Sequence, residues 1–289
     1  MDVQWFTERD GASIAFREWL VPNPRALVQI VHGVGEHSGR YGALAADLNA
    51  VGYAVYADDH RGHGLTGMRQ WHGDARKLGR PGHGGVRAAE GSVRRFTELL
   101  QARNPGLPVV LLAHSWGSFI AQRLLDEDAR DGRAAALPYA AVVLSGSAYR
   151  MPGWINAGDL NAEFAGEGGT GSEWLSRDPG VARAFAVDPL TTSTPLRTLF
   201  GLIDALRILG RPRPGLPTGL PLLLQVGGDD PVGGPRSVER LARAYRERGG
   251  LTDVTVLSYP GARHEVYNET NRAEVVGDLL AWVAAHLPA

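Results

Sequence analysis

The residues best suited to chemistry lie in the segment Ala113–Gly117 (AHSWG), between an apolar run and a stretch of helical character. A serine on such a strand-to-helix turn projects its hydroxyl out of the sheet at a helix N-terminus. The turn is strained and accepts only small flanking residues, a condition that Ala113 meets where the common G-x-S-x-G pattern has its first glycine. An ordinary structural turn is the alternative, but the strand–turn–helix context favours Ser115 as a nucleophile.

A serine hydroxyl becomes a good nucleophile only when a base accepts its proton and an acid orients that base. On doubly wound sheets these groups follow in the chain order Ser, Asp, His. Asp229 and Asp230 lie on a Gly-rich loop just past an apolar run, at the kind of strand end where catalytic groups gather. Both are candidates for the acid on this reasoning.

The histidine in the right place for the base is His264, in the loop between the last expected strand and the last expected helix. His114 adjoins Ser115 but precedes the acid, so we interpret it as a packing or orienting residue. His286 falls within the closing helix and is expected at the surface. Chain order therefore predicts His264 as the base.

Acyl transfer also requires hydrogen-bond donors aimed at the developing oxyanion. The loop His32–Gly35 (HGVG) follows an apolar run and can turn backbone N–H groups toward the nucleophile. We predict that the N–H groups of Val34 and Trp116 are these donors. Gly33 and Gly35 are also explained by turn formation, and both explanations can hold together.

Strand patterns alternate with helical patterns through most of the chain. The expected strands are 3–7, 13–19, 26–32, 53–57, 108–113, 140–145, 221–226 and 253–259. The expected helices are 41–51, 86–102, 117–128, 199–209, 236–248 and 271–286. Such alternation predicts an α/β fold with a doubly wound, mostly parallel eight-stranded sheet.

One region breaks this alternation. We therefore predict a core formed by residues 1–148 and 218–289 and a lid insertion formed by residues 149–217, which is too long for a plain connection. Within the insertion, Leu199, Leu202, Ile203 and Leu206 follow helical i, i+3, i+4 spacing. This stripe either docks the helix on the core or also lines an acyl pocket, and we take its residues as substrate-binding candidates.

Composition excludes several classes of protein. The 289 residues contain no cysteine, which excludes disulfides and thiol catalysis, and the formal charge of −1 gives no electrostatic basis for nucleic-acid binding. The first residues, MDVQWFTERDG, do not resemble a signal peptide, and no apolar run is long enough to span a bilayer. These features predict a cytoplasmic protein, and they leave its oligomeric state open.

Two other motifs suggest different chemistry. Residues 33–38 (GVGEHS) resemble a dinucleotide-binding fingerprint, but a serine stands where the last glycine is expected. Residues 59–64 (DHRGHG) bring two histidines and a carboxylate together, yet no distant third ligand is evident. We predict neither a cofactor nor a metal, and we expect residues 59–64 to pack beneath the site and shape it.

Several motifs occurring in order resemble the monoacylglycerol lipase and lysophospholipase branch of the α/β-hydrolases. They are HGVGEHSGRY (32–41), DHRGHG (59–64), HSWGS (114–118), GGDDPV (227–232) and GARHE (261–265), with EWLSRD (173–178) and DPL (188–190) in the insertion. The resemblance covers roughly residues 10–148 and 218–286. Most of the insertion does not match closely.

The resemblance implies Ser115 as nucleophile, Asp230 as acid and His264 as base, with Val34 and Trp116 as oxyanion donors. It implies single-chain acyl esters, of monoacylglycerol or lysophospholipid type, as substrates. It also suggests that the lid makes transient contact with a membrane or micelle. Methionine often follows the nucleophile in this branch, so the bulkier Trp116 is expected to narrow the acyl entrance.

Two alternatives remain open. An amidase, peptidase or perhydrolase could use the same scaffold, and a peptidase would need an acidic pair in the lid such as Glu163 and Glu167. A non-catalytic binder could retain the fold. Epoxide hydrolase or dehalogenase chemistry is disfavoured, because it needs a carboxylate where Ser115 stands.

Overall fold

An eight-stranded sheet forms the centre of the computed structural model, which describes residues 3–166 and 169–287. The strand order is β1-β2-β4-β3-β5-β6-β7-β8, with β1 antiparallel to β2 and β2 antiparallel to β4, whereas all other neighbours are parallel. The strands are β1 (Gln4–Thr7), β2 (Ser13–Trp19), β3 (Ala26–Val31), β4 (Tyr53–Asp58), β5 (Val109–His114), β6 (Ala141–Ser145), β7 (Leu222–Gly227) and β8 (Val254–Tyr259). The predicted doubly wound, mostly parallel sheet is confirmed.

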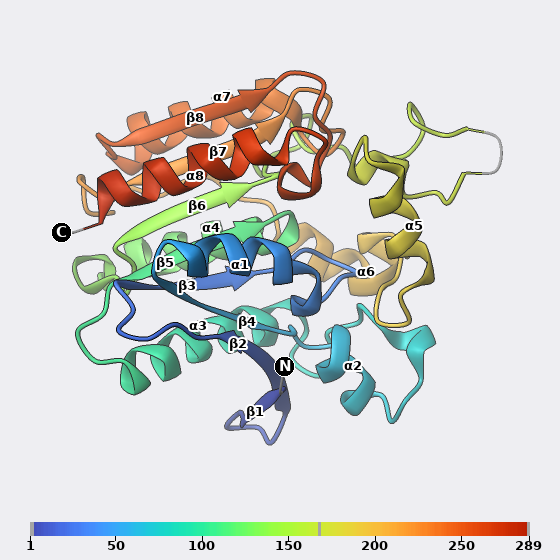
Figure 1. Cartoon of the computed structure of the whole chain (residues 1–289), viewed down its shortest axis with the longest axis horizontal. Coiled ribbons are helices and arrows are strands. Elements are labelled where there is room, and N and C mark those ends of the chain that lie inside the picture. The colour runs from blue at the N-terminus through green and yellow to red at the C-terminus, as the bar shows by residue number, and fades with distance from the viewer. Residues whose placement is uncertain (1–2, 167–168, 288–289) are drawn as a thin grey trace.

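Helices cover both faces of this sheet (Figure 1). Helices α1 and α8 pack on one face, and α3, α4 and α7 pack on the other. The helices are α1 (Gly42–Ala50), α2 (Gly64–Gln70), α3 (Gly85–Arg103), α4 (Trp116–Arg130), α5 (Pro179–Val187), α6 (Leu196–Arg207), α7 (Gly234–Ala244) and α8 (Arg272–His286). Of these, α2 and α5 were not predicted from the sequence.

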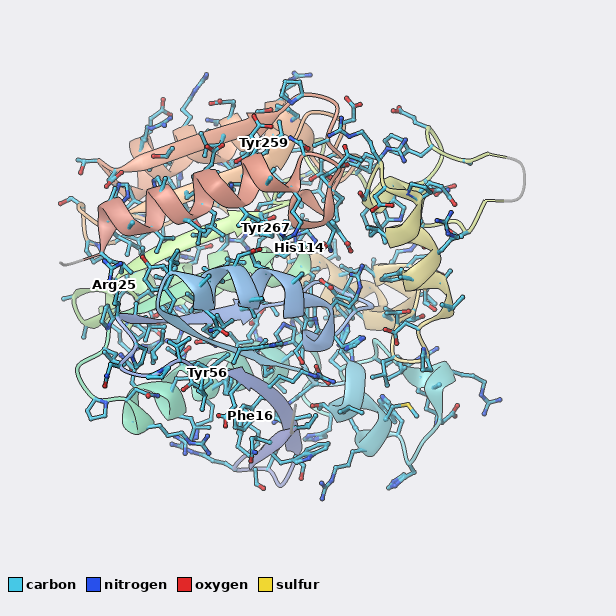
Figure 2. The ribbon with its side chains drawn as sticks, viewed as in Figure 1. Phe16, Arg25, Tyr56, His114, Tyr259 and Tyr267 are labelled. Carbon is cyan, nitrogen blue, oxygen red and sulfur yellow. The ribbon has the colours of Figure 1, made fainter. Side chains whose placement is uncertain are left out.

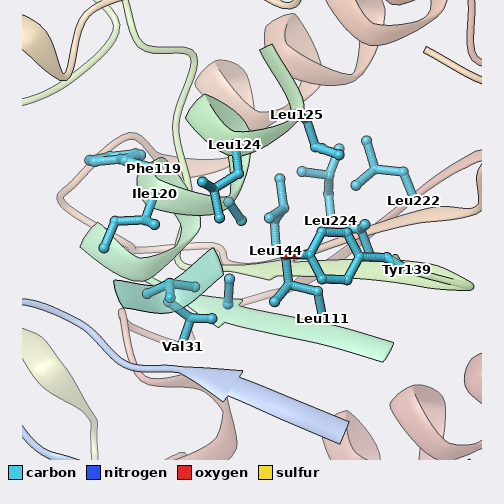
Figure 3. Packing of buried hydrophobic residues seen from close by; sticks show 14 of the residues in the cluster. Val31, Leu111, Phe119, Ile120, Leu124, Leu125, Tyr139, Leu144, Leu222 and Leu224 are labelled. Atoms are coloured by element: carbon cyan, nitrogen blue, oxygen red, sulfur yellow. The ribbon is translucent and has the colours of Figure 1, made fainter. Parts of the chain in front are cut away.

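The central strands are apolar because both of their faces are covered. Every residue of β3, β4, β5, β6 and β7 is buried. Helix α4 places Phe119, Ile120 and Leu124 against side chains of the sheet that include Val31 and Leu144 (Figure 3). A strand buried on both faces loses the polar–apolar alternation of a surface strand, which is why continuous apolar runs identified these strands correctly.

The order of the strands reverses between β3 and β5. From β3 the chain moves outward to β4 on one side, whereas β5 pairs on the other side and continues to β6. The loops after β3 and β5 therefore separate at the carboxyl end of the sheet. Open α/β sheets bind their ligands at such a switch point. Val34 follows β3 and Ser115 follows β5, so both lie at this position.

The segment between β6 and β7 contains a short 3-10 helix, η4 (Glu173–Leu175), and helices α5 and α6. Figure 1 shows α5 and α6 beyond the carboxyl ends of the strands. The helix predicted over 199–209 is shifted and interrupted, because Gly201 adopts φ 72° and ψ 173° inside α6. Among the described residues, no helix combines the length and apolarity needed to span a membrane.

Candidate active site

Ser115 occupies the sharp turn between β5 and α4. Its backbone has φ 53° and ψ −125°, a left-handed φ that costs energy for a residue with a Cβ. The turn is held by the Ser115 N–H, which donates to the carbonyl of Ser145 at 2.9 Å. A Cβ added at Gly117 would lie 2.1 Å from the carbonyl oxygen of Val31, so only glycine lets α4 begin this close to β3.

Asp230 and His264 form a buried pair on the loops after β7 and β8. The Nδ1–H of His264 donates to Oδ1 of Asp230 at 2.9 Å, and both side chains are almost fully buried. Asp230 Oδ1 also accepts the N–H of Val232 at 2.9 Å, which fixes the carboxylate. Asp229 is exposed instead, so the geometry separates the two candidate acids and pairs Asp230 with the histidine.

This pairing defines the state of the His264 ring. With Nδ1 donating to Asp230, Nε2 carries the lone pair, and it has no hydrogen-bond partner within residues 3–166 and 169–287. Burial alone would lower the pKa of His264, but the charge of Asp230 and its hydrogen bond outweigh burial and raise the pKa above its ordinary value. The ring is therefore held in one orientation, with an acceptor nitrogen that no described residue occupies.

The His264 ring and the Ser115 turn converge on the end of β6. A Cβ added at Gly146, which has φ 55°, would lie 2.8 Å from Cε1 of His264, and the preceding Ser145 accepts the N–H of Ser115. Ser115 and His264 share no hydrogen bond in the described structure. Catalytic hydrogen bonds are often long or misaligned without substrate and shorten only when it binds.

His114 lies between these groups as a neutral ring. Its centroid is 4.7 Å from that of His264, and its Nδ1 lies 3.2 Å from the hydroxyl of Ser145. Burial, followed by the nearby His264, lowers the pKa of His114 to about 4. His114 and Tyr267, which line a small pocket at this end of the sheet, are labelled in Figure 2. His114 therefore packs beside His264.

The loop after β3 brings backbone N–H groups beside the serine. A Cβ at Gly33 would lie 3.0 Å from Cβ of Ser115, so this loop and the nucleophile turn are in close contact. The N–H of Val34 has no acceptor among the described residues. Trp116 is the first residue of α4, and the first N–H groups of a helix have no intrahelical acceptor. Both predicted oxyanion donors are therefore without an acceptor in the part of the chain that the structure describes.

A buried ion cluster holds this loop in place. Oε1 of Glu36 accepts the N–H of Gly33 at 2.6 Å and the hydroxyl of Tyr41 at 2.8 Å. Arg40 donates to Glu36 at 2.8 Å and to Glu265 at 2.6 and 2.9 Å. Because Glu265 follows His264 directly, the cluster joins the loop after β3 to the loop that carries the base.

Residues 59–64 pack beneath the site, as expected from the sequence. The ring of His60 stacks on His32 with centroids 3.8 Å apart, and its Nδ1 bonds to Asp58 at 2.9 Å. His63 stacks on Trp116 at 5.2 Å, and burial lowers its pKa to about 3. These side chains therefore pack against one another and against Trp116, which directly follows Ser115.

The four residues of α6 that were predicted to bind substrate do not share one face. Leu199 is buried, and a Cβ at Gly79 would lie 2.6 Å from its Cδ1. Leu202, Ile203 and Leu206 are 65%, 69% and 55% exposed. The predicted common face is wrong, because the kink at Gly201 turns the later residues away from the core toward solvent.

The aromatic residues that do contact the site were not singled out from the sequence. Phe200 of α6 meets Trp116 with centroids 4.9 Å apart, and Trp174 of η4 meets His264 at 4.8 Å. Phe200 lies next to the kink at Gly201, and the spacing of apolar residues gave no indication that it contacts Trp116. Trp174 lies in the family-like stretch EWLSRD, which was the one available sign of its position.

Only one member of the acidic pair considered for a peptidase lies within the described residues. Glu163 is exposed, and Glu167 lies outside the described residues. Glu173 instead binds within its own loop, accepting the hydroxyl of Thr170 at 2.8 Å and the amide of Asn161 at 2.8 Å.

The eight-stranded sheet with a strained serine turn after β5 is an α/β-hydrolase fold. Residues 22–271 match the model of the family described as serine aminopeptidase, S33, and the chain belongs to this family. It is 32% identical to a monoacylglycerol lipase of Mycolicibacterium smegmatis over 96% of this chain and 95% of that protein. It is 30% identical to the monoglyceride lipase of Homo sapiens over 98% of this chain and 90% of the relative.

Solved structures agree with this fold. A thermostable carboxyl esterase from Bacillus coagulans, determined in complex with glycerol, superposes with a TM-score of 0.80 and 25% identity over 99% of both chains. A soluble variant of monoglyceride lipase from Saccharomyces cerevisiae, in complex with a substrate analog, superposes with a TM-score of 0.75 at 22% identity over 100% of this chain and 96% of that one.

Proposed function

We propose that this protein is a serine hydrolase that cleaves carboxylic esters, with Ser115 as nucleophile, His264 as base and Asp230 as acid. One observation carries the proposal. The Asp230–His264 hydrogen bond leaves Nε2 of the ring buried and without a partner among the described residues, at the strand end that also holds the strained serine turn. A base whose nitrogen is left free in this way can accept a proton from a neighbouring hydroxyl.

In the first half-reaction, Nε2 of His264 takes the proton of the Ser115 hydroxyl while the serine oxygen attacks the ester carbonyl carbon. The N–H groups of Val34 and Trp116 donate to the resulting oxyanion. When the tetrahedral intermediate collapses, the ester C–O bond breaks. The departing alcohol takes the proton from His264, and the acyl group stays on Ser115.

In the second half-reaction, a water molecule gives a proton to His264 and attacks the acyl carbonyl. The intermediate forms in the same oxyanion pocket. Its collapse breaks the bond to Ser115, which recovers the proton from His264, and the carboxylic acid leaves. Asp230 stays ionised throughout and stabilises the imidazolium that forms in each half.

The substrates we propose are single-chain acyl esters of the monoacylglycerol or lysophospholipid type. The lipases and the esterase to which the chain is similar support this class. We also propose that residues 149–217 act as a lid, because Phe200 and Trp174 from this segment cover Trp116 and His264. The contact between Phe200 and Trp116 would restrict the acyl entrance.

The family description makes an aminopeptidase the second candidate. That activity would need a group to hold the substrate's amino terminus, and Glu163 is exposed to solvent. Ester hydrolysis is therefore the better-supported activity. Comparing p-nitrophenyl esters with aminoacyl p-nitroanilides, at matched concentrations, separates the two: faster turnover of the anilides would replace our proposal.

Substitution Ser115→Ala tests the nucleophile. We expect hydrolysis of p-nitrophenyl butyrate to fall by about 10⁴-fold or more and labelling by a fluorophosphonate probe to disappear. Ser258→Ala is the control, because this serine is exposed on the edge strand β8 and lies outside the turn that carries Ser115. Retained labelling of the Ser115→Ala protein would disprove the assignment, and unlabelled wild-type protein would favour a non-catalytic binder.

A further inference from the structure

A second pocket lies at the far end of α4 from Ser115. Its volume is about 250 Å³, and one side is formed by Arg123, Asp126, Glu127 and Arg130, which follow each other at helical spacing on one face of α4. At 1.5 Å per residue these positions are roughly 10–21 Å from the start of the helix at Trp116. The pocket is thus separate from the site described above.

The charge of this pocket is strongly positive. Its lining includes the arginines Arg123, Arg130, Arg150, Arg211, Arg213 and Arg248, against two carboxylates, Asp126 and Glu127. Both carboxylates are already paired with inner arginines, Asp126 with Arg150 and Glu127 with Arg123. Arg130 is paired with Asp131 beside the pocket, so Arg211, Arg213 and Arg248 carry the positive charge that no carboxylate of the described residues compensates.

The inner arginines are fixed by the chain that returns from α6. Arg150 is 1% exposed and donates to the carbonyl of Ile208 at 2.8 Å and to the amide of Gln122 at 2.9 Å. Arg123 donates to the carbonyl of Arg207 at 2.7 Å. These hydrogen bonds hold the two inner arginines in place, so the inner wall of the pocket is rigid.

Three outer arginines are available to a ligand. Arg211 and Arg213 come from the segment after α6, and Arg248 comes from the turn after α7; all three are exposed. Within residues 3–166 and 169–287 none of them forms an ion pair, and the side chain of Arg248 makes one weak bond, to the carbonyl of Pro212 at 3.4 Å. Guanidinium groups converging on a concave site suit the several oxygens of a phosphate group.

We propose that this pocket binds a small phosphate-bearing anion, held by Arg211, Arg213 and Arg248. The bound phosphate would link the segment that returns from α6 to the turn after α7, over the rigid wall formed by Arg150. The proposal does not depend on ester hydrolysis, because no residue of the pocket belongs to the proposed catalytic group.

Binding is tested by isothermal titration calorimetry and thermal unfolding with inorganic phosphate and glycerol 3-phosphate, at constant ionic strength set with chloride. We expect saturable binding and a higher Tm with phosphate than with chloride. The triple variant Arg211→Gln, Arg213→Gln, Arg248→Gln should weaken affinity by about tenfold or more. Repeating the titration in the Ser115→Ala protein shows whether binding is independent of catalysis.

The matched control removes three exposed arginines from elsewhere, Arg9→Gln, Arg87→Gln and Arg243→Gln. This variant should bind phosphate like the wild type although its net charge changes equally. Equal weakening in both variants, or no saturable binding to the wild type, would overturn the proposal.

A vesicle arm identifies the source of the phosphate. Flotation with phosphatidylcholine vesicles containing phosphatidic acid, compared with vesicles lacking it, tests a lipid headgroup. Association that the triple variant loses and the control keeps supports the headgroup as ligand. Binding of glycerol 3-phosphate without vesicle association supports a free phosphate ester. Absence of both contradicts the site.

Discussion

The loops of the proposed catalytic group and helix α6 meet where Trp116 contacts Phe200, yet they are built differently. Around Ser115 the backbone is packed so closely that a Cβ at Gly117 would overlap the carbonyl of Val31. On α6, in contrast, Leu202 and Ile203 are more than half exposed.

This difference separates two tasks. Groups that stabilise a transition state must be held within fractions of an ångström, so their surroundings tolerate few side chains. A segment that admits substrates of varying length gains from fewer packing contacts. We therefore expect substitutions in the loops to change the catalytic rate. We expect substitutions in α6 to change the relative rates for different substrates or to leave activity unchanged.

After Ser115→Ala, the largest effect is expected for Asp230→Asn. Loss of the carboxylate should lower kcat by about 10³–10⁴-fold, because the imidazolium loses its stabilising charge and its fixed orientation. Asp229→Asn, on the exposed neighbour, should keep near-normal activity and serves as the control. If Asp229→Asn lowered kcat more than Asp230→Asn, the packing of the loop around Asp230 would not determine which carboxylate acts as the acid.

The same variant sharpens the comparison through pH. The raised pKa of His264 means that kcat/KM should fall as the pH drops through a value above 6.5, where the base becomes protonated. In Asp230→Asn this acid limb should move to lower pH. The stability contributed by protonated His264 beside Asp230 is present below pH 6.5 and is lost as the pH rises through the folded-state pKa, so activity appears where this contribution is gone.

The next largest effect is expected within α6 itself. Leu199→Ala removes a buried side chain that packs on Gly79, and should weaken the docking of α6 by about 2–5 kcal/mol. Hydrogen exchange of the α6 amides measures this docking directly. Leu202→Ala is the matched control on the exposed side of the kink. Equal protection in both variants would show that Leu199 does not anchor the helix.

A smaller effect is expected for Phe200→Ala. Removing the ring that covers Trp116 should widen the entrance and shift preference toward longer acyl chains by about tenfold in kcat/KM. A series of p-nitrophenyl esters of increasing chain length measures the shift. An unchanged profile would mean that Phe200 does not limit access, and Trp116→Met would then test the other member of the pair.

The smallest effect is expected for Leu202→Gln, Ile203→Gln and Leu206→Gln together. Because these side chains face solvent, the free energy of unfolding should change by less than about 0.5 kcal/mol per substitution. Urea unfolding provides the measurement. If the same variant leaves hydrolysis of a soluble ester unchanged but reduces it on micelles, the exposed residues contact an interface, which distinguishes that role from an acyl-pocket role.

Much of the fold could be predicted because its signals are local. The run ALVQIV of β3 is apolar except for Gln29, as expected of a strand covered on both faces, and the helices on either side follow their own periodicity. Helix α5 was missed because it is short and begins at a proline after a loop. The kink in α6 was missed because a glycine within a helical pattern is often tolerated.

The amino-acid sequence was enough to predict the chain order of Ser115, Asp230 and His264, the strand ends that carry them, and the small residues that the serine turn needs. Tertiary contacts were needed to show that Asp230 pairs with the ring, to bring Trp174 and Phe200 over the site, and to gather arginines from four separate segments into one pocket. These contacts join residues that lie far apart in the chain. Backbone conformation and periodic burial are set by neighbours, whereas contacts between loops depend on where every strand and helix comes to rest.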